Sequence, residues 1–113
     1  DSLAGYWDGS EEFVDTVNGV TALNRENRIN IEAPLLVMSK AEIIEEGLRL
    51  GVKFNDTWTC YSDRDDKLAD ATTPSSSLRV KGFMDAGYRD PIQYIQQEKL
   101  EKLYKENDCK ECA

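Results

Sequence analysis

The sequence predicts an α/β fold that is mostly helical and contains one or two strands. The first observation is the continuous apolar run Leu35–Met38, which is typical of a strand buried on both faces of a parallel sheet. The second is the pair Ser39 and Glu42, the signature of a capping box that begins a helix directly after this run. The third is the helical spacing of apolar residues in other segments of the chain.

The first third of the chain is expected to contain a loop, a helix and the strand. Residues 1–10 are expected to form a loop, because they include Gly5, Asp8 and Gly9, and glycine and aspartate are common in turns. A helix is expected from Ser10, because apolar side chains then recur at helical spacing, at Phe13, Val14, Val17 and Val20. Residues 28–38 are expected to form the strand, because apolar and polar residues alternate before the apolar run. Pro34 breaks this strand or places it at a sheet edge.

Three helices are expected in the remainder. The helix that begins at Ser39 should end at Gly51, since glycine is the usual residue just past a helix. A short helix is expected over residues 76–86. The last helix should be capped by Asp90 and carry Pro91 at its first position. One parallel strand is not stable without neighbours, so the chain is expected to be half of a larger unit.

Composition excludes several classes of function. The chain has 113 residues, enough for one domain, and its net charge of −8 argues against a general binder of nucleic acid or membrane surfaces. No apolar run is long enough to span a membrane and no signal-peptide pattern is present, so a cytoplasmic protein is expected. Histidine is absent, which excludes Ser-His-Asp and Cys-His catalysis within this chain.

Lys40 is the most informative single residue. It follows the expected helix cap, at the helix end whose partial positive charge disfavours a cation by roughly 0.3–1 kcal/mol. The residues three and four positions later are Ile43 and Ile44, so the same helix supplies no carboxylate. A bound anion such as a phosphate would explain a lysine here. The alternative is a lysine whose charged end extends into solvent.

Several segments, in their order and spacing, resemble the C-terminal half of the 7-cyano-7-deazaguanine synthase family. These enzymes are PP-loop ATP pyrophosphatases with an adenine-nucleotide α-hydrolase-like fold. The segments are Ala33–Leu35, Ser39–Ile43, Gly47–Val52, Thr57–Tyr61, Leu78–Phe83 and Ala86–Gly87. The resemblance implies that residues 1–91 form the C-terminal portion of a PP-loop fold. Residues 92–113 would be a helical extension that ends in Cys-x-x-Cys.

The resemblance also implies an activity, the ATP-dependent synthesis of a queuosine precursor. Enzymes of this family adenylate a carboxylate or amide, release pyrophosphate and use ammonia to form a nitrile. Lys40 matches the family lysine that contacts the pyrophosphate of ATP, so the resemblance assigns it a catalytic role. This agrees with the charge argument made from the helix alone.

One departure concerns the glycine-rich PP-loop, Ser-Gly-Gly-x-Asp-Ser, which opens the family's N-terminal half and has no counterpart here. Without its N–H groups around the phosphates, the chain is expected to be inactive alone. ATP with Mg would bind only together with an N-terminal PP-loop half, on the same or a separate chain. The alternative is a non-catalytic remnant that serves as a dimerisation or interaction module, and a homodimer is expected.

A second departure lies in the substrate loop, which in the family commonly reads Gly-Tyr-Pro-Asp-Cys-Arg. Here the corresponding residues are Gly5-Tyr6-Trp7-Asp8-Gly9-Ser10, so the resemblance implies that Tyr6, Asp8 and Ser10 face the substrate. The arginine that would bind a carboxylate with two hydrogen bonds is missing. Either the substrate differs or its recognition has decayed. Alternatively, Asp8 or Ser10 only caps the following helix.

A third departure concerns a structural zinc that the family holds with four cysteines. Cys60 matches one of them, whereas Asp70, Thr73 and Ser76 stand where the other three are expected, and hydroxyls are poor zinc ligands. A zinc site formed by Cys60, Cys109 and Cys112, completed by Asp70 or water, is a second arrangement. The alternatives are an exposed thiol pair or a labile disulfide at Cys109 and Cys112, and a buried apolar role for Cys60.

Overall fold

The computed structural model describes residues 5–62 and 64–112. The chain divides into two compact units, Asp1–Val37 and Met38–Ala113, and each is described by itself. The sequence-based boundary at residue 91 follows the family resemblance rather than compactness, and it stays a prediction. In the part of the chain that the structure describes, no helix has both the length and the apolar character to cross a membrane.

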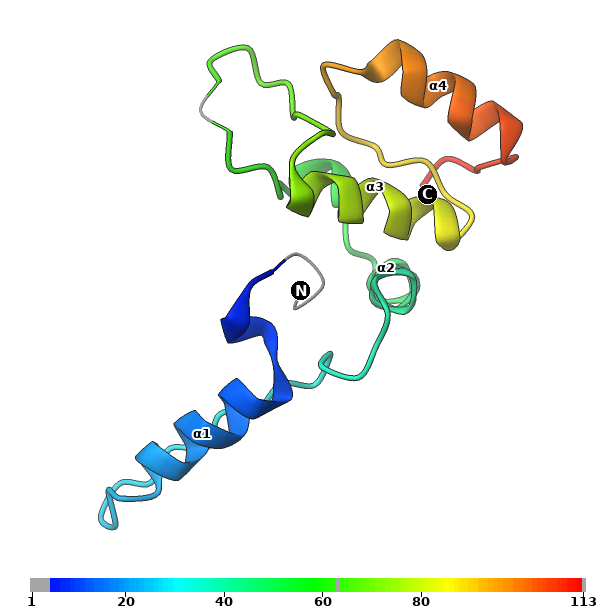
Figure 1. Ribbon diagram of the computed structural model, residues 1–113. Helices are drawn as coiled ribbons and strands as arrows, with labels where there is room; N and C mark the ends of the chain where they lie inside the picture. The colour runs from blue at the N-terminus through cyan, green and yellow to red at the C-terminus, as the bar shows by residue number, and fades with distance from the viewer. Residues whose placement is uncertain (1–4, 63, 113) are drawn as a thin grey trace. The chain divides into compact units, whose positions relative to one another are not determined.

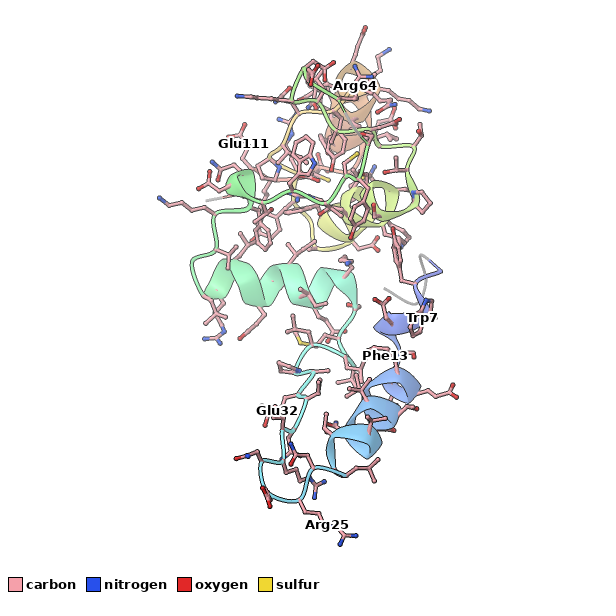
Figure 2. All side chains as sticks on the ribbon, turned by 90° about the vertical axis from the view of Figure 1, so that its left-hand side faces the viewer. Trp7, Phe13, Arg25, Glu32, Arg64 and Glu111 are labelled. Carbon is pink, nitrogen blue, oxygen red and sulfur yellow. The ribbon has the colours of Figure 1, made fainter. Side chains whose placement is uncertain are left out.

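The first unit contains a short 3-10 helix, η2 (Trp7–Gly9), and helix α1 (Glu11–Thr21). The side chain of Ser10 caps α1 by accepting a hydrogen bond of 3.1 Å from the backbone N–H of Phe13, as the sequence predicts. The rings of Trp7 and Phe13 pack edge to face, with centroids 5.2 Å apart (Figure 2). None of residues 5–37 is buried, so the described part of this unit has no buried core.

The strand predicted over residues 28–38 is wrong. Residues 28–33 have no regular structure, residues 34–37 form a turn, and among the described residues there are only two isolated β-bridges (Figure 1). A strand requires a partner for its backbone groups. Here the side-chain amide of Asn18 takes that place: Ile31 donates its N–H to Oδ1 at 2.7 Å, and Nδ2 donates to the Ile31 carbonyl at 3.0 Å.

The second unit begins with helix α2 (Lys40–Arg49), and both of its predicted ends are confirmed. Ser39 and Glu42 form the capping box. At the other end Gly51 has φ +81°, and its N–H donates to the carbonyl of Leu48 while the N–H of Val52 donates to that of Gly47. This pair of hydrogen bonds is a Schellman motif, which requires the left-handed conformation that glycine adopts without strain.

Three further helices follow: η3 (Phe54–Asp56), α3 (Pro74–Asp85) and α4 (Gln97–Glu106). Helix α3 begins at Pro74, two residues before the predicted start. The predicted cap of the last helix at Asp90 is wrong, because α4 begins only at Gln97. The carboxylate of Asp90 instead accepts hydrogen bonds from the buried side chain of Arg79. Residues 93–95 are held by backbone hydrogen bonds of 3.0 and 2.9 Å to Ala69.

The core of the second unit lies between α3, α4 and the loops before them. Helix α2 packs against α3 (Figure 1). The buried cluster consists of residues from α3, α4, and the segments 60–69 and 92–94, namely Cys60, Ala69, Val80, Ile92, Tyr94, Leu100 and Tyr104. Ile44 on α2 and Phe83 on α3 are also buried. The packing of α2 on α3 places Lys40, in the first turn of α2, beside Gly82 of α3.

Candidate functional site

Lys40 occupies the first position of α2, and the aliphatic part of its side chain packs against α3. A β-carbon built on Gly82 of α3 would collide with Cγ of Lys40 and would lie 3.0 Å from its Cβ. The same added atom would lie 3.2 Å from Cδ1 of Ile44. The lysine is therefore partly buried, and the bare backbone of Gly82 leaves room for its stem.

The charge of Lys40 is in an unfavourable environment. Burial, and then repulsion by the guanidinium of Arg79, lower the pKa of the Lys40 ammonium below its usual range. The partial positive charge of the helix N-terminus acts in the same direction. The folded environment therefore disfavours the charged form of the Lys40 side chain. Contact of Lys40 with a phosphate stays a prediction.

Arg79 is the centre of a buried hydrogen-bond network. Its Nε and Nη2 donate to the two carboxylate oxygens of Asp90 at 2.8 and 3.1 Å. The remaining donors reach Oγ1 of Thr59 at 3.2 Å and the carbonyl of Phe54 at 3.1 Å. Asp90 also accepts hydrogen bonds from the hydroxyl of Tyr94 and from the N–H of Ile92. These hydrogen bonds therefore fix the position of the guanidinium, whose positive charge repels that of Lys40.

Aromatic packing holds the same region from the side of α2. The ring of Phe54 covers Gly47 so closely that a β-carbon there would collide with it. Phe54 in turn packs edge to face on Phe83, with centroids 5.3 Å apart, and the Arg79 guanidinium lies 5.4 Å from the centroid of the Phe83 ring. Gly47 on α2 thus permits the close approach of Phe54 from η3, and Gly82 on α3 permits the close approach of α2.

The predicted substrate-facing residues Tyr6, Asp8 and Ser10 lie in the first unit. Ser10 is committed to the local structure, because its Oγ accepts from the N–H of Phe13 and donates to the carbonyl of Trp7 at 3.0 Å. The capping role of Ser10 is confirmed. Asp8 lies within η2 and is exposed, and Tyr6 is 39% exposed. Contact of these residues with a substrate stays a prediction.

Cys60 is buried in a cluster of hydrogen-bonding groups. Its Sγ lies 2.8 Å from Oγ of Ser62 and accepts the backbone N–H of Asp70 at 3.4 Å. Burial raises the pKa of the Cys60 thiol, but the hydrogen bonds from Ser62 and from the Asp70 N–H outweigh burial and bring it down to about 7. The site therefore stabilises a thiolate through hydrogen bonds.

The side chains at the family's zinc positions do not fit a zinc ion. The carboxylate of Asp70 is already used by the N–H and hydroxyl of Thr72, at 2.9 and 2.6 Å, and by Nε2 of Gln96, at 3.0 Å. The hydroxyl of Thr73 donates to the Asp70 carbonyl at 3.0 Å. With one thiol, one engaged carboxylate and two hydroxyls, the donor set lacks the thiolates that zinc prefers. Hydrogen bonds hold this loop instead.

The structure does not bring the three cysteines together as a ligand set. Cys109 packs partly against the core cluster, and the thiol of Cys112 donates to the carbonyl of Arg89 at 3.5 Å. Burial raises the pKa of both thiols above the usual range, whereas at Cys60 hydrogen bonds outweigh the effect of burial and lower the pKa. In residues 5–62 and 64–112, no three Cys, Asp or Glu side chains are grouped so that they could hold a metal ion.

Sequence reasoning missed the roles of Gly82, Arg79 and Asp90. In the sequence, Arg79 and Gly82 stand only within a segment that resembles the family, and Asp90 has the local context of a helix cap because proline follows it. Their spacing of three residues on α3 places Arg79 and Gly82 on one helical face, and this was the signal available in the sequence. That Asp90 is the partner of Arg79 depends on a tertiary contact.

Comparison with known proteins gives consistent matches. The family model for queuosine biosynthesis protein QueC matches residues 1–87. A 7-cyano-7-deazaguanine synthase of Clostridium kluyveri is 41% identical over 97 residues, which is 80% of this chain and 42% of the relative. The synthase of Thermoplasma acidophilum is 36% identical over 107 residues, 91% of this chain and 43% of the relative.

A third relative, the 7-cyano-7-deazaguanine synthase of Haloarcula marismortui, is 37% identical over 98 residues, 85% of this chain and 41% of the relative. The chain spans less than half the length of the curated relatives it matches, and the matches cover their C-terminal part. No solved structure gives a significant match.

Proposed function

Since this chain belongs to the queuosine biosynthesis protein QueC family, we propose that it is the C-terminal part of an ATP-dependent 7-cyano-7-deazaguanine synthase. In this proposal it works only with an N-terminal half that carries the PP-loop, on the same chain or a separate one. ATP and Mg would bind to the assembled pair. The chain by itself would be inactive, because it lacks the glycine-rich loop that holds the phosphates.

The observation that carries the proposal is the position of Lys40. The charged form of its ammonium is disfavoured by burial, by Arg79 and by the N-terminus of α2, and the attraction of a bound polyanion would offset these penalties. When the substrate is adenylated, pyrophosphate leaves with added negative charge. A lysine fixed at a helix N-terminus stabilises that charge more strongly in the transition state than in free ATP.

The exposed apolar side chains of the first unit support the N-terminal half as the partner. Ile29 is 65% exposed and Val37 is 90% exposed, and Ile31 and Leu35 are also exposed. These residues belong to the stretch whose sequence is typical of a buried parallel strand, yet it has no sheet to join within the described residues. A sheet supplied by the N-terminal half would cover them. A second copy of this chain is the alternative occupant.

The substrate-facing role belongs in this proposal to Tyr6 and Asp8, which remain exposed. Ser10 would contribute less, because its hydroxyl is already used to cap α1. No arginine occupies the position that would bind a substrate carboxylate with two hydrogen bonds. We therefore expect weaker selection for the carboxy-deazaguanine substrate than in relatives that have the arginine.

The test is reconstitution with the N-terminal half of a related synthase. The mixture should convert ATP to AMP and pyrophosphate when carboxy-deazaguanine and ammonia are added, while each half alone should not. Lys40→Ala should reduce kcat by about 10²–10³-fold. The matched control is Lys102→Ala, which removes an exposed lysine from α4 and should leave the rate unchanged.

An unchanged rate in the Lys40→Ala mixture would overturn the catalytic role of this residue. Sedimentation of the chain alone and with the N-terminal half separates the two occupants of the apolar surface. A heterodimer supports the synthase. A homodimer that excludes the N-terminal half would support the non-catalytic dimerisation module instead.

A further inference from the structure

Gly82 stands where a helix would ordinarily carry a side chain. It lies in the interior of α3, where glycine costs roughly 0.5–1 kcal/mol relative to alanine. Its backbone does not need glycine, since it is not among the residues with positive φ. The requirement is spatial: Gly82 is buried, and a β-carbon on it would collide with the Lys40 side chain.

We propose that Gly82 is a positioning residue, which holds Lys40 in place for its role at the pyrophosphate by leaving a bare backbone surface for the lysine stem. This inference rests on the proposed function for its catalytic consequence, but the packing relationship stands independently of it. A methyl group on Gly82 would push Cγ of Lys40 away from α3 and so move the ammonium. The groups around the lysine are held in place by their own contacts and do not make room for the methyl group.

Two features keep the surroundings of Lys40 rigid. Arg79, three residues before Gly82, is held by Asp90, Thr59 and the Phe54 carbonyl, so its guanidinium cannot move aside. Ile44, one turn after Lys40 on α2, is buried, and its Cδ1 would lie 3.2 Å from the added methyl carbon. The methyl group on Gly82 would therefore displace the flexible side chain of Lys40 rather than Arg79 or Ile44.

The first test is a double-mutant cycle on the stability of the full chain, measured by urea unfolding. Gly82→Ala should lower the urea midpoint, and this loss should be at least halved in a Lys40→Ala background, because the colliding Cγ is then absent. Gly47→Ala is the matched control: it collides with Phe54 instead, so its loss should be equal in both backgrounds. An equal loss for Gly82→Ala in both backgrounds would overturn the inference.

The second test uses the reconstituted synthase. Gly82→Ala should reduce kcat/KM for ATP by about ten- to a hundredfold, since a misplacement of about 1 Å has an effect of this size. Gly47→Ala, compared at a temperature where both variants are fully folded, should change it less than threefold. Equal losses for the two variants would mean a merely structural role and would overturn the positioning of Lys40.

The failure of the proposed function is distinguishable from the failure of this inference. If Lys40→Ala leaves the reconstituted rate unchanged, the catalytic role of Lys40 fails, and the urea cycle still decides whether Gly82 holds its side chain. If the cycle shows no coupling while Lys40→Ala is inactive, the catalytic role stands and the positioning role of Gly82 is overturned.

Discussion

The carboxylate of Asp90 and the guanidinium of Arg79 form a buried, two-point ion pair, with hydrogen bonds of 2.8 and 3.1 Å. The pair links the start of the 90–96 segment to α3. Arg79 also donates hydrogen bonds to Oγ1 of Thr59 and to the carbonyl of Phe54. A single contact thus joins four segments of the second unit and fixes the charge that faces Lys40.

Breaking this pair should be strongly destabilising. Asp90→Asn leaves the buried guanidinium without its charged partner, and we expect a loss of about 3–5 kcal/mol in the free energy of unfolding. Asp85→Asn is the control, because it breaks an ion pair between the exposed side chains of Lys81 and Asp85 and should cost less than about 1 kcal/mol. Urea unfolding measures both. A loss below about 1 kcal/mol for Asp90→Asn would contradict the network.

The Cys60 thiol predicts a dependence of stability on pH. Its pKa is about 7 in the folded chain and near 9 when unfolded, so the unfolded chain binds more protons between these values. The stabilisation is present above pH 9 and is lost as pH falls through 7. Unfolding free energy should therefore rise from pH 7 to pH 9, by up to about 2 kcal/mol. Cys60→Ser, compared at each pH, should show a smaller rise, and an equal rise would contradict the hydrogen-bonded thiolate.

The hydrogen bonds between Asn18 and Ile31 should protect a single amide. Asn18→Ala removes the acceptor of the Ile31 N–H and the donor to its carbonyl, so amide hydrogen exchange at Ile31 should become faster by about five- to tenfold. Asn24→Ala serves as the control, since the Asn24 side chain accepts the N–H of Asn27 and not that of Ile31. Unchanged exchange at Ile31 would mean that this interaction does not hold the segment.

Replacing Lys40 by methionine should stabilise the chain. The folded pKa of the lysine is lowered, so its charged form opposes folding at neutral pH. Its favourable contribution is present only above the unfolded pKa and is lost as pH falls through the folded pKa. Lys40→Met keeps a stem on Gly82 and removes the charge, which should add about 0.3–1 kcal/mol at pH 7. Thermal unfolding at pH 7 measures this, and a loss of stability would contradict the lowered pKa of Lys40.

Local signals predicted the helices well where a cap and an apolar stripe occur together. The Ser10 cap, the Ser39–Glu42 capping box and the glycine after α2 act over three to five residues, so neighbouring sequence suffices to determine them. The predicted start of α4 was wrong because a distant residue, rather than the neighbouring sequence, decides the role of Asp90. Asp90 has the local context of a cap, but the distant Arg79 competes for its carboxylate and prevails inside the core.

By itself, the sequence determined the start of α1, both ends of α2, the placement of Lys40 at a helix N-terminus and, through its motifs, the family. Only the tertiary structure decided which distant groups meet: Arg79 with Asp90, Gly82 with the stem of Lys40, and Cys60 with the Asp70 N–H. The stretch at residues 28–38 shows the physical reason most clearly. Its apolar pattern is that of a strand, but a strand exists only when another strand supplies the matching hydrogen bonds, and the described residues provide the Asn18 amide instead.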